Sequence, residues 1–411
     1  MRFLLCILLF FISNNCLSSS IDFKLDKVIE IYKLNGFDCK ATQPHNKKLT
    51  ALGKELFDST LLSGGNDTSC STCHLAQRHR TDGLSLAIGV GGKGEGTERL
   101  LEGNGIIVPR NAFTFSGRGH KDYVTYFWDG KVEVQSKKIV NILGNMTDKG
   151  FDSPFAMATI LPILARDEFL GLLDYSKSNE MVAIDDSYYE ARYDHASQFL
   201  KDKIKNSKGS KWDELRNLFI KSSIDLEKLE LSHLGNAISS FLIETENCFE
   251  SKWSHYIKGD KTALNELQKK GAYLFYGKGR CASCHSGDLL SDFKFHSIAV
   301  PQGKFGFSID GQDLGRSEIS LRYEDRFKFK TPSLLNVINT PPYGHNGIFN
   351  TLDEVILFHL NPVPFFSMYE YSEDEIYNYG RVLSSRSQLL SHIEIFTEEE
   401  VNQLVEFVKT L

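Results

Sequence analysis

Two copies of one short motif carry the clearest chemistry in this chain. Cys-x-x-Cys-His stands at residues 70–74 and again at residues 281–285. This spacing lets two thiols reach the two vinyl groups of a porphyrin, while the adjacent His ligates the iron from the proximal side. A redox disulfide or half of a zinc site is the alternative for a single copy, but two copies favour two covalent c-type haems. The predicted haem-binding residues are Cys70, Cys73, His74, Cys281, Cys284 and His285.

The first twenty residues are typical of a secretory signal peptide. Arg2 is followed by the apolar run Phe3–Ile12 and then by small polar residues, which is the order of segments in such a leader. A lipid attached at Cys16 is an alternative, although the residues before it are not the small apolar set expected there. Either way, the mature protein leaves the cytoplasm, and we expect it in the periplasm.

Two cysteines remain outside the leader and the haem motifs, namely Cys39 and Cys248. In an oxidising compartment, two leftover thiols can pair as a disulfide. Because a separation in sequence carries no information about distance in space, the sequence leaves open whether these two pair.

The composition is that of a globular protein with room for two domains. The chain has 411 residues, of which 41% are hydrophobic and 24% are charged, and this length supports two hydrophobic cores. The longest apolar run is too short to cross a bilayer, which excludes a multi-span membrane protein. The net charge of -6 gives no electrostatic reason to expect nucleic acid as a partner.

An internal duplication extends beyond the haem motifs. The pattern Gly-x-x-Leu-Phe precedes the first motif at Gly53–Phe57 and the second at Gly271–Phe275, on apolar spacing typical of a helix. Downstream, residues 110–114 precede Phe-Trp-Asp-Gly in the first half, much as residues 331–336 precede Tyr-Gly-His-Asn-Gly in the second. Two similar haem-binding halves follow from this repetition.

Most of the remaining pattern is helical. Three capping boxes, each followed by an apolar stripe, begin at Thr351, Ser372 and Thr397. Strand signals are few, and the best of them is the short alternation Phe327–Lys330. We therefore expect a mainly α fold, with two c-type cytochrome domains packed against each other and little β structure.

The order of these motifs resembles the bacterial di-haem cytochrome c peroxidase superfamily, including its MauG-like branch. The likeness covers roughly residues 49–360. It is carried by Leu52–Phe57, Cys70–His74, Arg110–Asn111, Phe127–Glu133, Ser153–Pro162, Arg166–Gly171, Tyr256–Asp260, Cys281–Gly287, Phe295–His296, Asp313–Arg316 and Pro332–Gly347. Such ordered agreement is specific for the fold and less so for the substrate.

The internal duplication suggests how the chain divides, and the resemblance implies the role of each part. The two halves meet in a lysine-rich, helical stretch, and we place the boundary near residue 225. The expected segments are a signal peptide at 1–20, a first haem domain that reacts with peroxide at 21–225, and a second, electron-transferring haem domain at 226–411.

Individual roles carry over to single residues of this chain. The resemblance implies that Trp128 lies between the two haems and that Glu168 is the catalytic acid and base, although Phe169 stands where Met is usual. An ordinary core aromatic and a surface glutamate are the alternatives. A calcium ion between the domains is common in the family, and Asn111 is its candidate ligand. Phe113 replaces the usual Pro beside it.

Two departures from the family pattern bear on how the irons are ligated. Val90 stands where some members carry a His that blocks the first iron, and valine has no donor atom, so we expect an open distal position opposite His74. His359 stands where many peroxidases place an axial Met. A lone helical His is more often structural, yet a haem that needs a sixth ligand favours His359 as the partner of His285.

The expected function is that of an exported di-haem peroxidase that reduces hydrogen peroxide. Electrons would arrive from a small redox protein such as a cytochrome c or a cupredoxin. A MauG-like oxidase that modifies another protein or a small molecule is the alternative, and a non-catalytic di-haem electron carrier is a weaker one. The sequence leaves the donor, the substrate and a homodimeric state open.

Overall fold

The computed structural model describes residues 20–102, 105–142, 149–171, 181, 184, 189–302, 306, 311–367, 372–391 and 393–411. Residues 1–19 of the predicted signal peptide, with Cys16, lie outside this set. Across the part of the chain that is described, no helix combines the length and the apolar character that spanning a bilayer requires.

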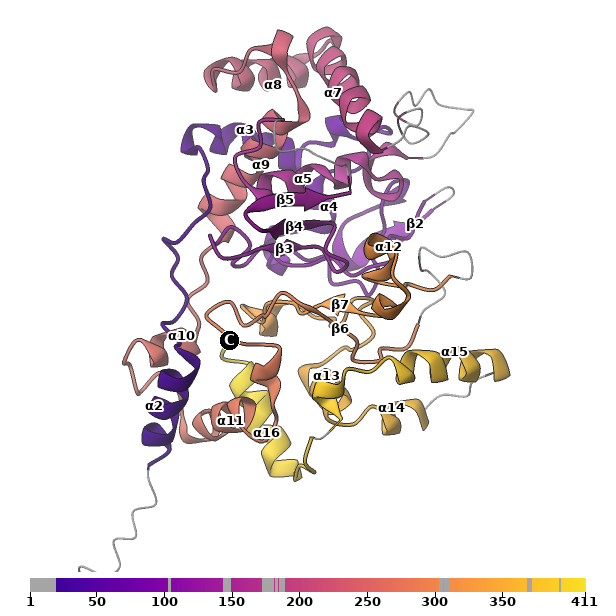
Figure 1. Ribbon diagram of the computed structural model, residues 1–411. Helices are drawn as coiled ribbons and strands as arrows, with labels where there is room; N and C mark the ends of the chain where they lie inside the picture. The colour runs from indigo at the N-terminus through magenta and orange to yellow at the C-terminus, as the bar shows by residue number, and fades with distance from the viewer. Residues whose placement is uncertain are drawn as a thin grey trace, which may run out of the picture.

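The architecture is mainly helical, as predicted (Figure 1). The α-helices are α2 (Ile21–Tyr32), α3 (Thr50–Asp58), α4 (Cys70–Cys73), α5 (Pro154–Ile160), α7 (Tyr189–Asn206), α8 (Ser210–Lys221), α9 (Leu231–Glu246), α10 (Lys252–Ile257), α11 (Glu266–Tyr276), α12 (Ser317–Ser320), α13 (Leu352–Leu360), α14 (Val363–Ser367), α15 (Glu373–Ser384) and α16 (Glu398–Val408). The strands are β1 (Gly92–Lys93), β2 (Leu100–Leu101), β3 (Thr125–Tyr126), β4 (Val132–Gln135), β5 (Lys138–Asn141), β6 (Phe295–His296) and β7 (Phe329–Lys330).

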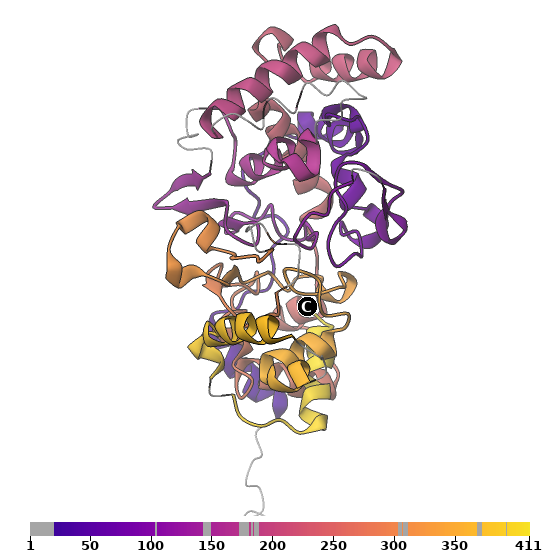
Figure 2. The same ribbon diagram turned by 90° about the vertical axis from the view of Figure 1, so that its right-hand side faces the viewer.

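The strands form three small antiparallel sheets, ordered β1-β2, β3-β4-β5 and β6-β7. Strand β7 covers the second half of the alternation predicted at Phe327–Lys330. Figure 1 shows β3, β4 and β5 in the upper half of the molecule and β6 with β7 near the junction between the halves. Figure 2, turned by 90°, shows the same stacking of one half above the other.

Two of the predicted helix starts carry complete capping boxes. The backbone N–H of Glu354 donates to Thr351 Oγ1 over 3.2 Å, and that of Glu400 donates to Thr397 Oγ1 over 3.2 Å. Each Glu side chain accepts in return from the N–H of its N-cap residue. These reciprocal bonds satisfy donors that a helix end otherwise leaves free, so α13 and α16 begin where the sequence predicts.

The glycines of the duplicated pattern are the points at which helices cross. A Cβ on Gly53 of α3 would overlap with the carbonyl oxygen of Ala237 in α9, and one on Gly271 of α11 would overlap with that of Gln403 in α16. Only glycine allows two helix backbones to approach so closely. Each half is therefore built on the same crossing, with the helix before its haem motif packed against a later helix.

Two helices pack across the boundary predicted near residue 225. Helix α9 lies after that boundary but packs on α3 and α5 of the first half. Helix α2 lies at the beginning of the chain but packs on α11 of the second half, as its indigo ribbon beside α10 and α11 shows (Figure 1). Each half thus takes one helix from the other side of the predicted boundary.

A disulfide ties these exchanged segments together. Cys39, which follows α2, is bonded to Cys248, which follows α9, and their Cα atoms lie 4.8 Å apart. This separation is within the usual range for a disulfide. The pairing that the sequence left open is therefore present in the structure, and it bridges 209 residues of chain.

A buried ion cluster joins the two halves. Nε and Nη2 of Arg110 each donate to the carboxylate of Asp313 over 2.8 Å, Nη1 pairs with Asp129, and Nη2 reaches Glu318 at 3.1 Å. Arg316 adds a second link, since it donates to the carbonyl oxygen of Asp129 over 3.0 Å. A buried arginine is stable only with its anionic partners, so this cluster positions one half against the other.

The crossing at Gly271 gives a direct test of the packing. Gly271→Ala should lower the free energy of unfolding by about 1–3 kcal/mol, because the added methyl meets backbone that cannot move aside. Gly380→Ala, in α15, is the matched control: nothing lies within 4 Å of its added Cβ, and removing a helical glycine should stabilise by about 0.5–1 kcal/mol. Thermal unfolding of both variants measures the difference, and equal midpoints would contradict the close crossing.

Candidate functional site

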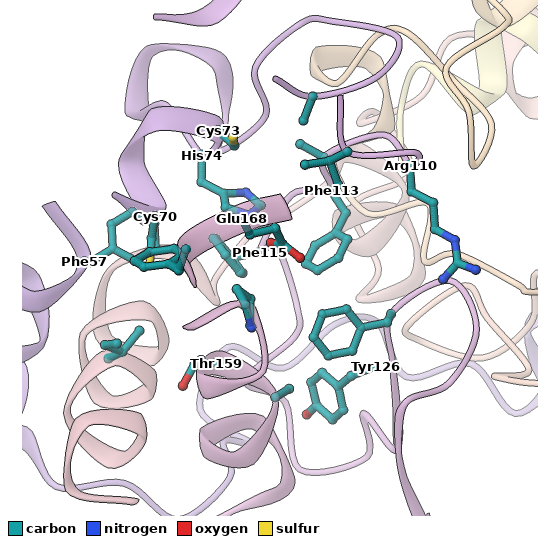
Figure 3. Close-up of a pocket in the computed structure, with 18 of the residues that line it drawn as sticks. Phe57, Cys70, Cys73, His74, Arg110, Phe113, Phe115, Tyr126, Thr159 and Glu168 are labelled. Carbon is teal, nitrogen blue, oxygen red and sulfur yellow. The ribbon is translucent and has the colours of Figure 1, made fainter. Parts of the chain in front are cut away.

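The first haem motif forms one wall of a largely apolar cavity. Cys70 and Cys73 lie at the two ends of the short helix α4, and the side chain of Thr72 closes that turn by accepting from the N–H of Ser69 over 3.0 Å. Figure 3 shows both cysteines and His74 on the same side of the cavity. Aromatic rings complete much of its wall: Phe57, Phe113, Phe115, Tyr126, Phe127, Trp128, Phe155 and Phe169.

His74 is oriented as an iron ligand should be. Its Nδ1 donates to the carbonyl oxygen of Arg80 over 2.7 Å, because a carbonyl can only accept. This bond leaves the lone pair of Nε2 available for a metal. Burial lowers the pKa of His74 to about 4, so the ring is neutral, as ligation requires.

Glu168 faces the same cavity from a π-helical turn, η6 (Arg166–Leu170). In Figure 3 its carboxyl group lies between His74 and Phe113. Burial raises the pKa of Glu168, and the positive charge of Lys131, which also borders the cavity, opposes that shift. A carboxyl group that binds a proton more readily than an exposed one is suited to exchange protons with a substrate.

Val90 lies behind the cavity wall rather than in it. The residue is buried, its N–H donates to Asp167 O over 3.1 Å, and its carbonyl accepts from Ile106 N over 3.1 Å. The neighbouring Gly89 borders the cavity instead. Among the described residues that line this first cavity, His74 is the only imidazole and no methionine is present.

The second motif borders a second, larger cavity, which brings Cys281, Cys284, His285 and His359 together. His285 donates from Nδ1 to Leu290 O over 3.1 Å. His359, on α13, donates from Nδ1 to Val355 O over 2.6 Å. Both rings thus keep Nε2 free for a metal, and burial lowers the pKa of both. The two cysteines and two neutral imidazoles fit a c-type haem held from both faces.

A backbone carbonyl oxygen from a similar turn accepts a hydrogen bond from each proximal histidine and orients its ring. The carbonyl oxygens that accept from His74 and His285 belong to Arg80 and Leu290, and these residues have φ of 66° and 51°. A positive φ is unusual for side chains of this size. The strained turn in each half is therefore what points a carbonyl back at the histidine ring, and it extends the duplication beyond what the sequence indicated.

One wall is common to both cavities. The residues that border both are Asn111, Ala112, Phe113, Arg118, Phe127 and Trp128. The indole N–H of Trp128 donates to the backbone oxygen of Asn111 over 3.2 Å, which fixes the ring within this wall. A large aromatic side chain is thus held where the two cavities adjoin, at the position that the resemblance implies.

The side-chain amide of Asn111 donates a hydrogen bond within the protein. Its Nδ2 donates to Leu84 O over 2.9 Å. The cluster of potential metal ligands found among the described residues lies elsewhere and consists of Cys284, Asp292 and His296. The calcium ion predicted at Asn111 therefore stays a prediction.

Three cavity residues, Lys131, Arg118 and Lys330, were given no role from the sequence, whereas a fourth, His296, belongs to the Phe295–His296 motif that carries the resemblance. Lys131 borders the first cavity, Arg118 borders both, and Lys330 and His296 border the second. His296 donates to Asp292 over 2.8 Å, and this carboxylate together with Cys284 raises its pKa to about 9. His296 and Lys131 lie within sequence motifs that carry the resemblance, whereas Arg118 and Lys330 lie outside them.

Comparison with known proteins agrees with this geometry. The sequence profile of the family described as di-haem cytochrome c peroxidase matches residues 47–262. The cytochrome-c peroxidase IdrP1 of Pseudomonas sp. (strain SCT) is 24% identical over 90% of this chain and 82% of its own. The methylamine utilization protein MauG of Methylorubrum extorquens is 27% identical over 76% of this chain and 69% of its own.

Solved structures share the fold. A MauG-like protein associated with microbial copper homeostasis superimposes with a TM-score of 0.60 at 22% identity, over 92% of both chains. The di-haem peroxidase BthA from Burkholderia thailandensis gives the same TM-score at 20% identity, over 92% of this chain and 89% of that one. The profile match spans more than half of the sequence, and the chain therefore belongs to the di-haem cytochrome c peroxidase family.

Proposed function

We propose that this protein is an exported peroxidase that reduces hydrogen peroxide in the first cavity and draws electrons through the second. One observation carries the proposal. The first cavity offers His74 as an iron ligand and Glu168 as a proton-exchanging group, while its described lining contributes no second imidazole and no methionine. Such a site leaves one face of the iron for a substrate.

The protein's own contribution to this chemistry is ligation and proton transfer. A c-type haem supplies the iron and the electron-carrying macrocycle. Glu168 takes the proton from the inner oxygen of peroxide and returns one to the outer oxygen, which promotes cleavage of the O–O bond. With two electrons and two protons, hydrogen peroxide leaves as two molecules of water. The apolar walls keep other water and other reductants away from the site.

Electrons would enter through the second cavity. His285 and His359 would hold the iron of the second haem, and ligation by two histidines would give it a lower potential than ligation by His and Met. Trp128, on the wall common to both cavities, shortens the path between them. A small cytochrome c or a cupredoxin is the proposed external donor.

Two features support export to the periplasm. The residues at the beginning of the chain have the pattern of a signal peptide. Cys39 and Cys248 form a disulfide, and structural disulfides persist in oxidising compartments.

A MauG-like oxidase is the second candidate, because this chain is about as similar to MauG as to the named peroxidases. Stopped-flow mixing with peroxide, followed by turnover with reduced cytochrome c or cupredoxin, separates the two. Sustained donor oxidation supports the peroxidase, and reaction with peroxide without turnover supports the oxidase. A protein that does not react with peroxide would be an electron carrier.

The number of covalent haems is the first expectation to test. The mature protein should carry two additions of haem mass, because both motifs present paired cysteines beside a cavity. Replacing Cys70 and Cys73 by Ala should remove the peroxide-reactive haem and leave the spectrum of the other. The reciprocal pair, Cys281→Ala with Cys284→Ala, is the control. Intact mass spectrometry counts the haems, and a mature chain without them would refute the proposal.

Glu168→Gln should slow peroxide-driven oxidation by roughly 10²–10⁴-fold, because positioned proton transfer contributes that much. Both haems should stay attached. Since burial raises the pKa of Glu168, the rate of the unsubstituted protein should fall as the pH drops through that raised value, and the variant should lose this acidic limb. Glu324→Gln changes an exposed glutamate and is the control. An undiminished rate in E168Q would assign the proton to another group.

The oxidised resting protein should hold one high-spin haem and one low-spin haem with two histidine ligands. The first expectation follows from the described lining of the first cavity, which holds no imidazole besides His74 and no methionine. The second follows from the free Nε2 of His359. Electron paramagnetic resonance distinguishes the two signals. His359→Ala should convert the low-spin signal alone. Two low-spin signals in the untouched protein would exclude an open first site, and a methionine-type charge-transfer band would exclude His359.

A further inference from the structure

Two buried cations face the haem cavities from the wall between them. Arg118 borders both cavities, and Lys330 borders the second. Only 7% of Arg118 and 2% of Lys330 is exposed to solvent. The backbone N–H of Lys330 donates to the carbonyl oxygen of Trp128 over 2.8 Å, so this lysine is anchored to the shared wall.

Neither cation forms an ion pair within the described part of the chain. Arg118 donates from Nε to Thr114 O over 2.6 Å, its Nη1 is buried without a hydrogen-bond partner, and its guanidinium carbon lies 3.7 Å from the centre of the Phe113 ring. Lys330 Nζ has two neutral acceptors, Thr331 O at 3.2 Å and the hydroxyl of Tyr123 at 3.4 Å.

The surroundings of Lys330 and Arg118 disfavour the charged forms of both side chains. Burial, and then the nearby charge of Arg118, lower the pKa of Lys330 well below its usual range. The charge of Asp292 opposes this shift, but that carboxylate is hydrogen bonded to His296. Arg110 shows the contrast, because it is equally buried and has carboxylates around it. Two like charges taken out of water need anions beside them.

A haem brings such anions, since its two propionate carboxylates are its only negatively charged side groups. We propose that Arg118 and Lys330 bind these propionates at the edge where the two cavities meet: Lys330 holds a propionate of the second haem, and Arg118 contacts a propionate of each haem. Arginine and lysine form charge-assisted hydrogen bonds with carboxylates, which are stronger than neutral ones. This proposal rests on haem attachment at both motifs and is independent of peroxidase activity.

The proposal predicts which haem responds to which cation. A positive charge beside a propionate favours the reduced iron, because it offsets the negative charge of the cofactor. Lys330→Gln should therefore shift the midpoint potential of the second haem to a more negative value and leave that of the first unchanged. Arg118→Gln should shift both potentials in the same direction.

Spectroelectrochemical titration of the two-haem protein measures both potentials. Lys330→Arg and Arg118→Lys keep the charge and should restore most of the shift. Lys294→Gln is the matched control, because Lys294 flanks the same strand region but is exposed and borders neither cavity. Intact mass spectrometry first establishes that each variant holds two haems. Unchanged potentials in both Gln variants would overturn the proposal, and so would an equal shift in the Lys294 control.

An infrared readout covers the case in which a Gln variant does not assemble. The redox-induced infrared difference spectrum contains the carboxylate bands of the propionates. Lys330→Arg, which keeps the charge, should shift one of these bands, since the hydrogen-bond donor to that carboxylate changes from an ammonium to a guanidinium group. An identical propionate spectrum in Lys330→Arg and the unsubstituted protein would refute contact with Lys330.

Discussion

The buried guanidinium of Arg110 is the centre of the ion cluster that joins the two halves of the molecule. Its carboxylate partners come from both halves, with Asp129 on one side and Asp313 on the other. Breaking such a pair leaves an uncompensated charge in a dry environment, so the ion cluster favours the arrangement of the halves that keeps these pairs intact. Asn111 follows Arg110 in the chain and Trp128 precedes Asp129. The wall that both cavities share therefore depends on this ion cluster for its place.

Within each half, backbone geometry rather than side-chain packing sets the haem ligands. Gly53 and Gly271 let the helices cross with backbones in contact, and this crossing fixes the helix that leads into each pair of cysteines. The turn that ends at Arg80 or Leu290 then aims a carbonyl oxygen at the proximal histidine. A neutral imidazole held through Nδ1 can offer only Nε2 to a metal. The two halves therefore share a backbone arrangement around their haem motifs more closely than they share side chains.

Features encoded locally could be predicted from the sequence, and features that depend on the path of the chain could not. The mainly α fold and the helix starts at Thr351 and Thr397 follow from spacing and capping chemistry, the family follows from the resemblance of the ordered motifs, and all three are confirmed. Cys39 and Cys248 are separated by 209 residues of chain, and nothing in the sequence around either cysteine indicates that they pair. Helix α9 is buried along nearly its whole length, so its pattern does not reveal which half it joins. The roles of Glu168, Trp128 and His359 stay predictions that the geometry supports.

The buried cations at the junction of the halves are of two kinds, one surrounded by carboxylates and the other surrounded by neutral groups. Arg110 is surrounded by three carboxylates, those of Asp129, Asp313 and Glu318. Burial, together with the charges of the other two acids, raises the pKa of Glu318 to about 7. Toward the cavities the balance is reversed, since among the described residues the buried Arg118 and Lys330 have only neutral hydrogen-bond acceptors. The carboxylates around Arg110 do not neutralise Arg118 and Lys330, because they are paired with Arg110 and join the two halves. In the proposal made above, the haem propionates supply the anions that Arg118 and Lys330 lack, so the assembly of the two halves and the binding of the haems are electrostatically coupled.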